Sequence, residues 1–228
     1  MYETGTDMKQ PHSKLLDLAA KHHLAPLGLA RIGRSRTWLD DQRWYAIVVE
    51  FQPSGFGKGS YLNVGAHFLW RTSGHLSFDL GYRVGSFIRF ESEAQFAPEA
   101  DRLAAVAATE TARLRALLIG VQAVASSIPA ELDVWPSYHR AIALGLLGNA
   151  LEASPIFTRL GVPLDPAPWQ AELATLCRAL QRLLGNPVEF RAAIVRIIKQ
   201  QRSALRLPEI SEPLTDTDVV AHTATVVH

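Results

Sequence analysis

Two stretches of alternating apolar side chains constrain the fold of this chain most. Residues 44–51 and 61–70 both carry an apolar side chain at every second position. Because successive side chains of a β-strand point to opposite faces, each stretch is predicted to be a strand with one apolar face. These faces consist of Tyr45, Ile47, Val49 and Phe51 in the first strand and Leu62, Val64, Ala66, Phe68 and Trp70 in the second.

Further strands are expected on both sides of this pair. Residues 31–40 and 76–90 contain aromatic and β-branched residues, and Gly81 and Gly85 in the second stretch predict a bulge or a bend. Residues 53–60 are so rich in glycine that a mobile loop is expected there. The pattern over residues 27–91 thus predicts an antiparallel sheet of about five strands.

Helical periodicity precedes and follows this region. Residues 13–24 predict a short first helix, and apolar spacings of three and four residues recur after Pro98. Small residues such as Gly145, in a helix expected at residues 137–150, would let a neighbouring helix approach closely. Gly185 is expected to close the next helix in a left-handed conformation, and Asn186 to cap the last one.

The predicted fold class is α+β, an antiparallel sheet packed with a helical layer of four or five helices. No charged or low-complexity linker separates the two regions, so residues 1–207 are expected to form one domain. Its sheet region spans residues 27–91 and its helical region residues 98–206. Residues 208–228 lack periodicity and are expected to be a tail.

The composition excludes several classes of protein. Nearly half of the 228 residues are hydrophobic and 23 basic side chains balance 22 acidic ones, which argues against disorder and against a chain-wide attraction to nucleic acid. The single cysteine, Cys177, and a start without a secretion signal predict a cytoplasmic protein. Apolar runs such as residues 141–147 are far shorter than the roughly 20 residues of a membrane span, so no membrane partner is expected.

The segment RIGRSRTW at residues 31–38, followed by Trp44, residues 49–53 and residues 61–65, resembles uncharacterised bacterial proteins known only as domains of unknown function. The resemblance covers residues 27–90. It implies a basic, aromatic strand pair, a strand bearing a glutamate and a strand holding an asparagine, and it implies no activity. It also suggests a biological context, an accessory role in a bacterial defence or conflict module.

Four residues form a candidate catalytic set for a metal-dependent nuclease or phosphodiesterase. A turn carboxylate followed by an apolar strand that ends in Glu-x-Lys can hold Mg²⁺ and orient a water. Here glutamine replaces the lysine, and it cannot stabilise developing negative charge as an ammonium group does. Adjacent aspartates are also ordinary turn residues. The candidate residues are Asp40, Asp41, Glu50 and Gln52.

A second candidate is a binding surface of interleaved arginine and tryptophan, joined by the asparagine of the next strand. Guanidinium groups can pair with phosphates or carboxylates, while indole rings stack on a base or a side chain. Alternatively, the arginines lie on the solvent face of an edge strand, where positive charge discourages aggregation. The candidate binding residues are Arg34, Arg36, Trp38, Arg43, Trp44 and Asn63.

The last predicted helix has a basic side opposite its isoleucines. Such a helix can bind nucleic acid or an acidic protein, or it can simply present a solvated face. The basic residues are Arg191, Arg196, Lys199, Arg202 and Arg206.

The adjacent His22 and His23 would diverge by about 100° on a helix, and no histidine or cysteine stands at metal-binding spacing, so no metal ligand is expected.

The function predicted from these patterns is a non-enzymatic binding or protein-interaction domain in the cytoplasm. No complete catalytic set is present in the sequence, so no cofactor is expected. A protein is the expected partner, with nucleic acid as an alternative through the basic helix. The alternative function is the Mg²⁺-dependent nuclease or phosphodiesterase that would use Asp41 and Glu50.

Overall fold

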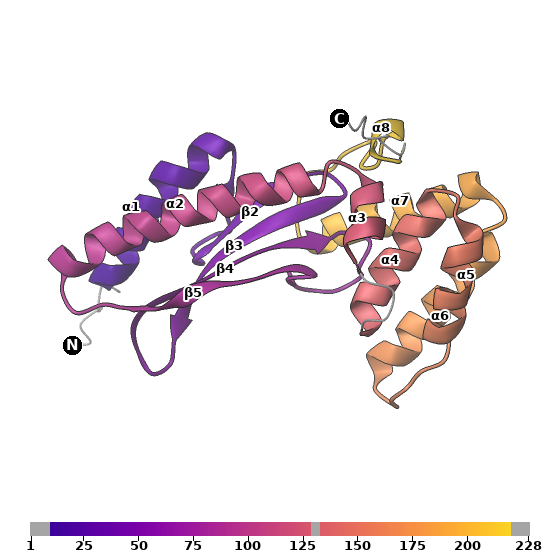
Figure 1. Cartoon of the computed structure of the whole chain (residues 1–228), viewed down its shortest axis with the longest axis horizontal. Coiled ribbons are helices and arrows are strands. Elements are labelled where there is room, and N and C mark those ends of the chain that lie inside the picture. The colour runs from indigo at the N-terminus through magenta and orange to yellow at the C-terminus, as the bar shows by residue number, and fades with distance from the viewer. Residues whose placement is uncertain (1–9, 129–132, 220–228) are drawn as a thin grey trace, which may run out of the picture. The chain divides into compact units, whose positions relative to one another are not determined.

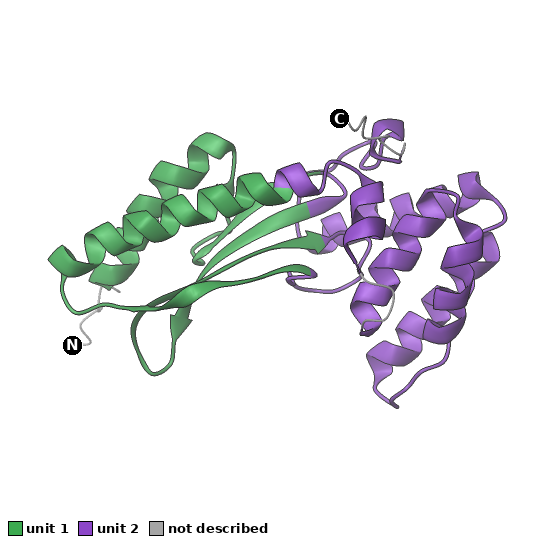
Figure 2. Cartoon of the chain, in the orientation of Figure 1, with its two compact units in different colours: residues 1–42, 46–67, 80–114 green, residues 43–45, 68–79, 115–228 purple. Residues whose placement is uncertain are grey.

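The computed structural model describes residues 10–128 and 133–219 (Figure 1). The chain divides into two compact units, each of which contains segments that are distant in the sequence (Figure 2). Unit 1 comprises residues 1–42, 46–67 and 80–114, and unit 2 comprises residues 43–45, 68–79 and 115–228. The predicted single domain over residues 1–207 stays a prediction.

The predicted antiparallel sheet of five strands is confirmed. Its strands follow one another in sequence order, so that each pairs with its neighbour in the chain. This order is the simplest that short turns can connect. The strands are β1 (Ala30–Arg31), β2 (Thr37–Asp41), β3 (Tyr45–Ser54), β4 (Gly57–Phe68) and β5 (Leu80–Arg89).

The predicted mobile loop at residues 53–60 is wrong. β3 continues to Ser54 and β4 begins at Gly57, so only Gly55 and Phe56 form the turn. Gly59 serves strand pairing instead, because a Cβ there would lie 2.1 Å from the carbonyl oxygen of Ile88. Glycine here reflects a close approach of two backbones.

The predicted bulge in the last strand is confirmed. The register of β4 and β5 shifts between Ser60 and Leu62, so β5 has extra residues at this point. Gly85 lies there with a φ of 69°, a left-handed conformation that other residues rarely adopt. The bulge interrupts the outer edge of the sheet, which makes continued strand pairing with another chain less favourable.

Two helices run along one side of the sheet, α1 (Pro11–Leu24) and α2 (Glu93–Leu117), of which α1 and the residues of α2 up to Leu114 belong to unit 1 (Figure 1). The hydroxyl of Tyr82 on β5 donates to Glu110 on α2, which places α2 on the face that Tyr82 shares with its partner Val64. The apolar side chains of this face are buried. They include Ile47, Val49, Leu62 and Val64, none more than 1% exposed.

Six further helices belong to unit 2, so the described residues hold eight α-helices where four or five were predicted. Two of the extra helices arise at Gly120 and Gly148, and another, at Asp216–Val219, lies in the predicted tail. Gly120 has an extended backbone that separates α2 from α3, and Gly148 has a φ of 78° between α4 and α5. The six are α3 (Val121–Ser127), α4 (Val134–Leu146), α5 (Ala150–Leu160), α6 (Pro168–Leu183), α7 (Pro187–Ala204) and α8 (Asp216–Val219).

The predicted start of the last helix is confirmed, whereas the predicted cap before it is wrong. The side chain of Asn186 accepts a hydrogen bond from the backbone N–H of Glu189 at 3.3 Å. Gly185 does not have a positive φ; instead α6 ends with Leu184 in a right-handed conformation. The amide of Leu184 closes a tight turn on Gln181, so no left-handed residue is needed.

Part of the predicted tail is packed within unit 2. Leu214 and Asp218 are buried, and the guanidinium of Arg191 donates to the carbonyl oxygen of Leu214 at 2.9 Å. Residues 220–228 lie outside the described residues. Among the helices of the described ranges, none is both long enough and apolar enough to cross a membrane.

The predicted close approach of a neighbouring helix at Gly145 is confirmed, since α7 packs there against α4, and this packing can be tested. A Cβ there would lie 2.4 Å from Cζ of Phe190 on α7, a ring that is fully buried. We expect Gly145→Ala to lower the free energy of unfolding by about 1 kcal/mol or more, because overpacking outweighs the better helix propensity of alanine. Chemical denaturation measures the change. Gly185→Ala, where no atom lies within 4 Å, is the matched control, and equal stability of the two variants would contradict this packing.

Candidate functional site

The sheet of unit 1 has a second face, which points away from the residues packed under α1 and α2. Strand alternation places Asn63 and its partner Arg83 on this face, opposite to Leu62 and Val84. Part of this face is buried, at Ala46, Val48 and His67, whereas the part next to the β3–β4 turn carries exposed or half-buried side chains. We call this exposed part the open face and define it by Glu50, Gln52, Tyr61, Asn63, Arg83, Phe87 and Arg89.

A hydrogen-bond network holds the polar side chains of the open face in place. The amide of Asn63 donates to Oε2 of Glu50 and to Oε1 of Gln52, both at 2.9 Å. The guanidinium of Arg83 donates to Oδ1 of Asn63 at 3.2 Å and to Oε1 of Gln52 at 2.7 Å. Three strands therefore contribute to one fixed polar cluster.

Aromatic rings lie beside this network. The Cζ atom of Arg83 lies 4.1 Å from the ring centroid of Tyr61, and the ring of Phe87 lies 4.9 Å from that of Tyr61. Nearby, the turn between β3 and β4 presents Phe56, which is fully exposed. An oriented cation with aromatic neighbours is a common feature of protein-binding surfaces.

The open face contains one predicted binding residue, Asn63, and two of the predicted catalytic residues, Glu50 and Gln52. The aspartates of the candidate nuclease lie elsewhere. Glu50 pairs with Thr37 across β2 and β3, whereas Asp41 pairs with Ala46. Asp41 is therefore displaced by four residues, about 13 Å along the strand at roughly 3.3 Å per residue.

Asp40 points to the opposite side of the sheet from Glu50. It is buried and accepts a hydrogen bond from the side chain of Gln42 at 2.9 Å. A Mg²⁺ ion needs its carboxylate ligands within about 2.1 Å of itself. In the described structure the four predicted catalytic residues are thus not brought to one point.

The two tryptophans of the predicted binding surface are core residues, so their predicted role as stacking platforms is wrong. Trp38 is 6% exposed and Trp44 is 1% exposed. In unit 2 the indole of Trp44 stacks on the rings of Trp70 and Phe68, with centroids 5.1 and 6.1 Å apart. Both faces of β3 are buried along residues 45–49, which the alternation of the sequence did not indicate.

The three arginines of that surface have different environments. Arg34 is exposed in the turn between β1 and β2. Arg36 is half-buried and donates to Oγ of Ser13 at 2.5 Å and to Nε2 of His12 at 3.1 Å. Arg43 forms an ion pair with Asp218 at 2.8 Å within unit 2. Arg36 and Arg43 therefore hold segments of the fold together.

The basic residues predicted for one side of the last helix also differ in their exposure to solvent. Arg196, Lys199 and Arg206 are exposed on or just after α7. Arg202, in contrast, is 2% exposed and donates to the carbonyl oxygens of Arg43 and Pro208 at 2.9 and 2.7 Å. The interpretation of Arg202 as a solvated cation is wrong, because a chain segment distant in sequence covers it.

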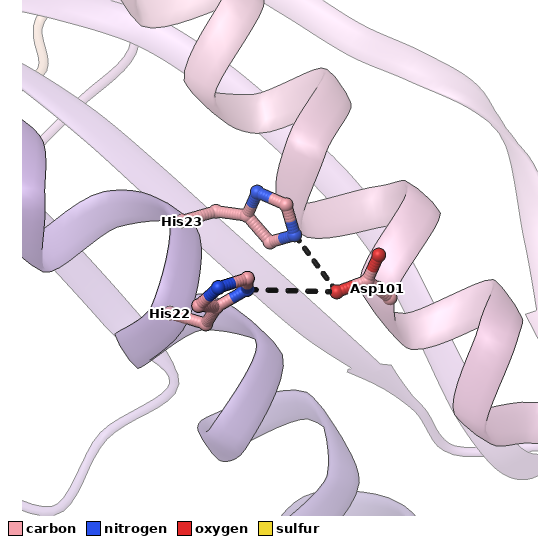
Figure 3. Close-up of side chains that lie close together, drawn as sticks. All are labelled: His22, His23 and Asp101. Atoms are coloured by element: carbon pink, nitrogen blue, oxygen red, sulfur yellow. Dashed lines mark hydrogen bonds and ion pairs between the residues drawn. The ribbon is translucent and has the colours of Figure 1, made fainter.

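Two histidines and an aspartate that the sequence did not connect lie together in unit 1 (Figure 3). Nε2 of His23 lies 2.8 Å from Oδ1 of Asp101, and Nδ1 of His22 lies 3.9 Å from the same oxygen. The histidines end α1 and Asp101 belongs to α2. Neither helix alone shows metal-ligand spacing, which is why sequence inspection missed the cluster.

Unit 2 contains a cavity of about 280 Å³ that Ser137, Arg159, Val162, Leu164 and Gln170 help to line. The guanidinium of Arg159 donates to Oγ of Ser137 at 2.7 Å, so its charge is partly engaged. The volume lies below the 300–1,000 Å³ or so that is usual for drug-sized ligands. The open face is therefore the stronger candidate site.

Cys177 is buried, so we expect its thiol to be unreactive in the native protein. Burial raises the pKa of the thiol from 9.0 to about 12. At pH 8 the thiolate fraction is then roughly a thousandfold smaller than for an ordinary thiol. We expect a thiol-specific chromogenic reagent to leave the native protein unmodified and to titrate one thiol per chain in denaturant. Rapid modification of the native protein would contradict this environment.

His12 should make stability depend on pH. Burial, then the nearby Arg36 and Lys58, lower the pKa of this imidazole below 6.5. The unfolded chain therefore binds the proton more tightly, so the contribution of His12 is complete above about pH 6.5 and is lost as the pH falls toward the folded-state pKa.

The variant His12→Gln isolates this contribution, because glutamine keeps an acceptor for Arg36 and does not titrate. Between pH 7 and pH 5 we expect the free energy of unfolding to fall more in the wild type than in His12→Gln. Denaturation curves at each pH measure both slopes. Parallel slopes would show that His12 is not the titrating group.

Comparison of the chain with protein-family models, with curated proteins and with solved structures found no match. The resemblance of residues 27–90 to uncharacterised bacterial proteins stays a prediction.

Proposed function

We propose that this protein is a non-enzymatic binding protein that recognises an acidic segment of a protein partner through the open face. The observation that carries the proposal is the fixed guanidinium of Arg83, held on the ring of Tyr61 by Asn63 and Gln52. A group that is already oriented loses little conformational entropy when it binds.

Arg83 forms no direct ion pair with a carboxylate of the described residues. Its hydrogen bonds within residues 10–128 and 133–219 go to the neutral side chains of Asn63 and Gln52. The one carboxylate of the network, on Glu50, accepts from Asn63 instead. An exposed, oriented guanidinium with free N–H groups matches a carboxylate, which it can bind with two parallel hydrogen bonds.

The side chains around Arg83 determine what else the partner would present. Tyr61, Phe87 and the exposed Phe56 provide aromatic surface, and such residues together with arginine dominate the affinity of protein interfaces. A partner segment with a carboxylate next to apolar side chains would bind both the guanidinium of Arg83 and this aromatic surface. This supports a short acidic and apolar peptide as the ligand.

A protein partner is favoured over a nucleic acid by the charge of the open face. Arg83 and Arg89 are its basic residues and Glu50 opposes them, which leaves a net charge of +1 by the count 2 − 1. Nucleic-acid binding draws most of its affinity from several phosphate contacts at once.

The proposed cytoplasmic location rests on the single cysteine, which leaves no intramolecular disulfide.

Selection of peptides from a random display library tests the proposal. Peptides selected on the wild type should be enriched in Asp or Glu next to aliphatic or aromatic residues. Their affinity, measured by fluorescence anisotropy, should fall tenfold or more in Arg83→Ala, because about 1.4 kcal/mol corresponds to a factor of ten in Kd. NMR chemical-shift changes should map to β3, β4 and β5.

The matched control is Arg34→Ala, which removes an exposed arginine from a turn outside the open face. It should bind the selected peptides as the wild type does. Selected peptides that bind Arg83→Ala equally well would reject the open face as the site. Tight, salt-sensitive binding of a single-stranded oligonucleotide that depends on Arg83, without peptide binding, would assign the face to nucleic acid instead.

A further inference from the structure

The cluster of His22, His23 and Asp101 lies outside the open face and has a chemistry of its own. Each residue offers one ligand atom, and the three atoms all lie within 4.8 Å of one another. In Figure 3 both imidazoles from the end of α1 approach the same carboxylate on α2. The rings of His22 and His23 are themselves close, with centroids 4.7 Å apart.

The spacing of these atoms suits a transition-metal ion. Zn²⁺ binds imidazole nitrogen and carboxylate oxygen at about 2.0–2.2 Å, so neighbouring ligand atoms in a tetrahedral site are roughly 3.4 Å apart. The two distances to Oδ1 of Asp101, 2.8 and 3.9 Å, lie on either side of that value. Small rotations of exposed side chains would adjust them to one ion.

The kind of ligand also selects the metal. Two imidazoles and one carboxylate favour Zn²⁺ and its transition-metal neighbours, whereas Mg²⁺ and Ca²⁺ prefer ligand sets made of oxygen atoms. The carboxylate adds a negative charge that compensates part of the charge of the ion. His22 and Asp101 are exposed and His23 is partly buried, so an ion can enter from solvent.

We propose that His22, His23 and Asp101 form a binding site for a divalent transition metal, with Zn²⁺ as the fitting ion, that links α1 to α2. Three protein ligands leave the fourth tetrahedral position to water or to a donor from another molecule. Metal at this position would stabilise the folded state, because the two helices come together only on folding.

Zinc titration of the full chain, free of any affinity tag and treated with chelator, tests the site. Isothermal titration calorimetry should show one Zn²⁺ per chain, and Zn²⁺ should raise the melting temperature while Mg²⁺ at the same concentration should not. Each of His22→Ala, His23→Ala and Asp101→Asn should weaken Zn²⁺ binding at least tenfold. Co²⁺ should give the visible absorption of a tetrahedral complex with the wild type only.

Two controls keep the outcome clear. His75→Ala removes an exposed histidine from unit 2 and should bind Zn²⁺ as the wild type does. Circular dichroism without metal shows whether each variant is folded, and Asp101→Asn retains an oxygen that can accept from His23. The absence of stoichiometric Zn²⁺ binding by the wild type, or equal affinity in Asp101→Asn and wild type, overturns the proposal.

Discussion

The structure of unit 1 depends on the burial of one apolar face of its sheet beneath α1 and α2. Ile47, Val49, Leu62 and Val64 have almost no contact with water, and burying each contributes about 1.5–3 kcal/mol. This burial sets the register of the central strands, since a shift of one residue would move these four side chains to the opposite face of the sheet. It thereby also determines which side chains point the other way, and these include Glu50, Asn63 and Arg83.

Arginine has two distinct roles in this protein. Arg36 and Arg202 use their guanidinium groups inside the fold, donating to Ser13 and His12 in one case and to backbone carbonyl oxygens in the other. Arg83 makes hydrogen bonds to neutral side chains at the surface and keeps an accessible charge. Since removal of a buried arginine leaves acceptors unsatisfied, the first role concerns stability and the second recognition.

Local patterns predicted the elements well where one physical requirement dominated. Alternation identified β3 and β4, and the predicted cap at Asn186 located the start of α7. Prediction was poorer where two requirements compete. The glycines within residues 53–60 predict a mobile loop, although Gly59 is glycine because the carbonyl oxygen of Ile88, nearly thirty residues away in the chain, leaves no room for a Cβ. Interleaved arginine and aromatic side chains are expected at residues 34–44. In the structure, the exposed arginine with aromatic neighbours is instead Arg83, which lies beside Tyr61 and Phe87.

The sequence by itself determined the fold class, the antiparallel central strands and the sidedness of Asn63 and Glu50, because these follow from side-chain periodicity within single elements. Only the tertiary structure decided the burial of Trp38, Trp44 and Arg202 and the meeting of His22 and His23 with Asp101. The physical reason is that burial and proximity depend on which distant segments pack together. An amphipathic pattern predicts that one face of an element will be buried, but it does not predict which segment of the chain will cover that face.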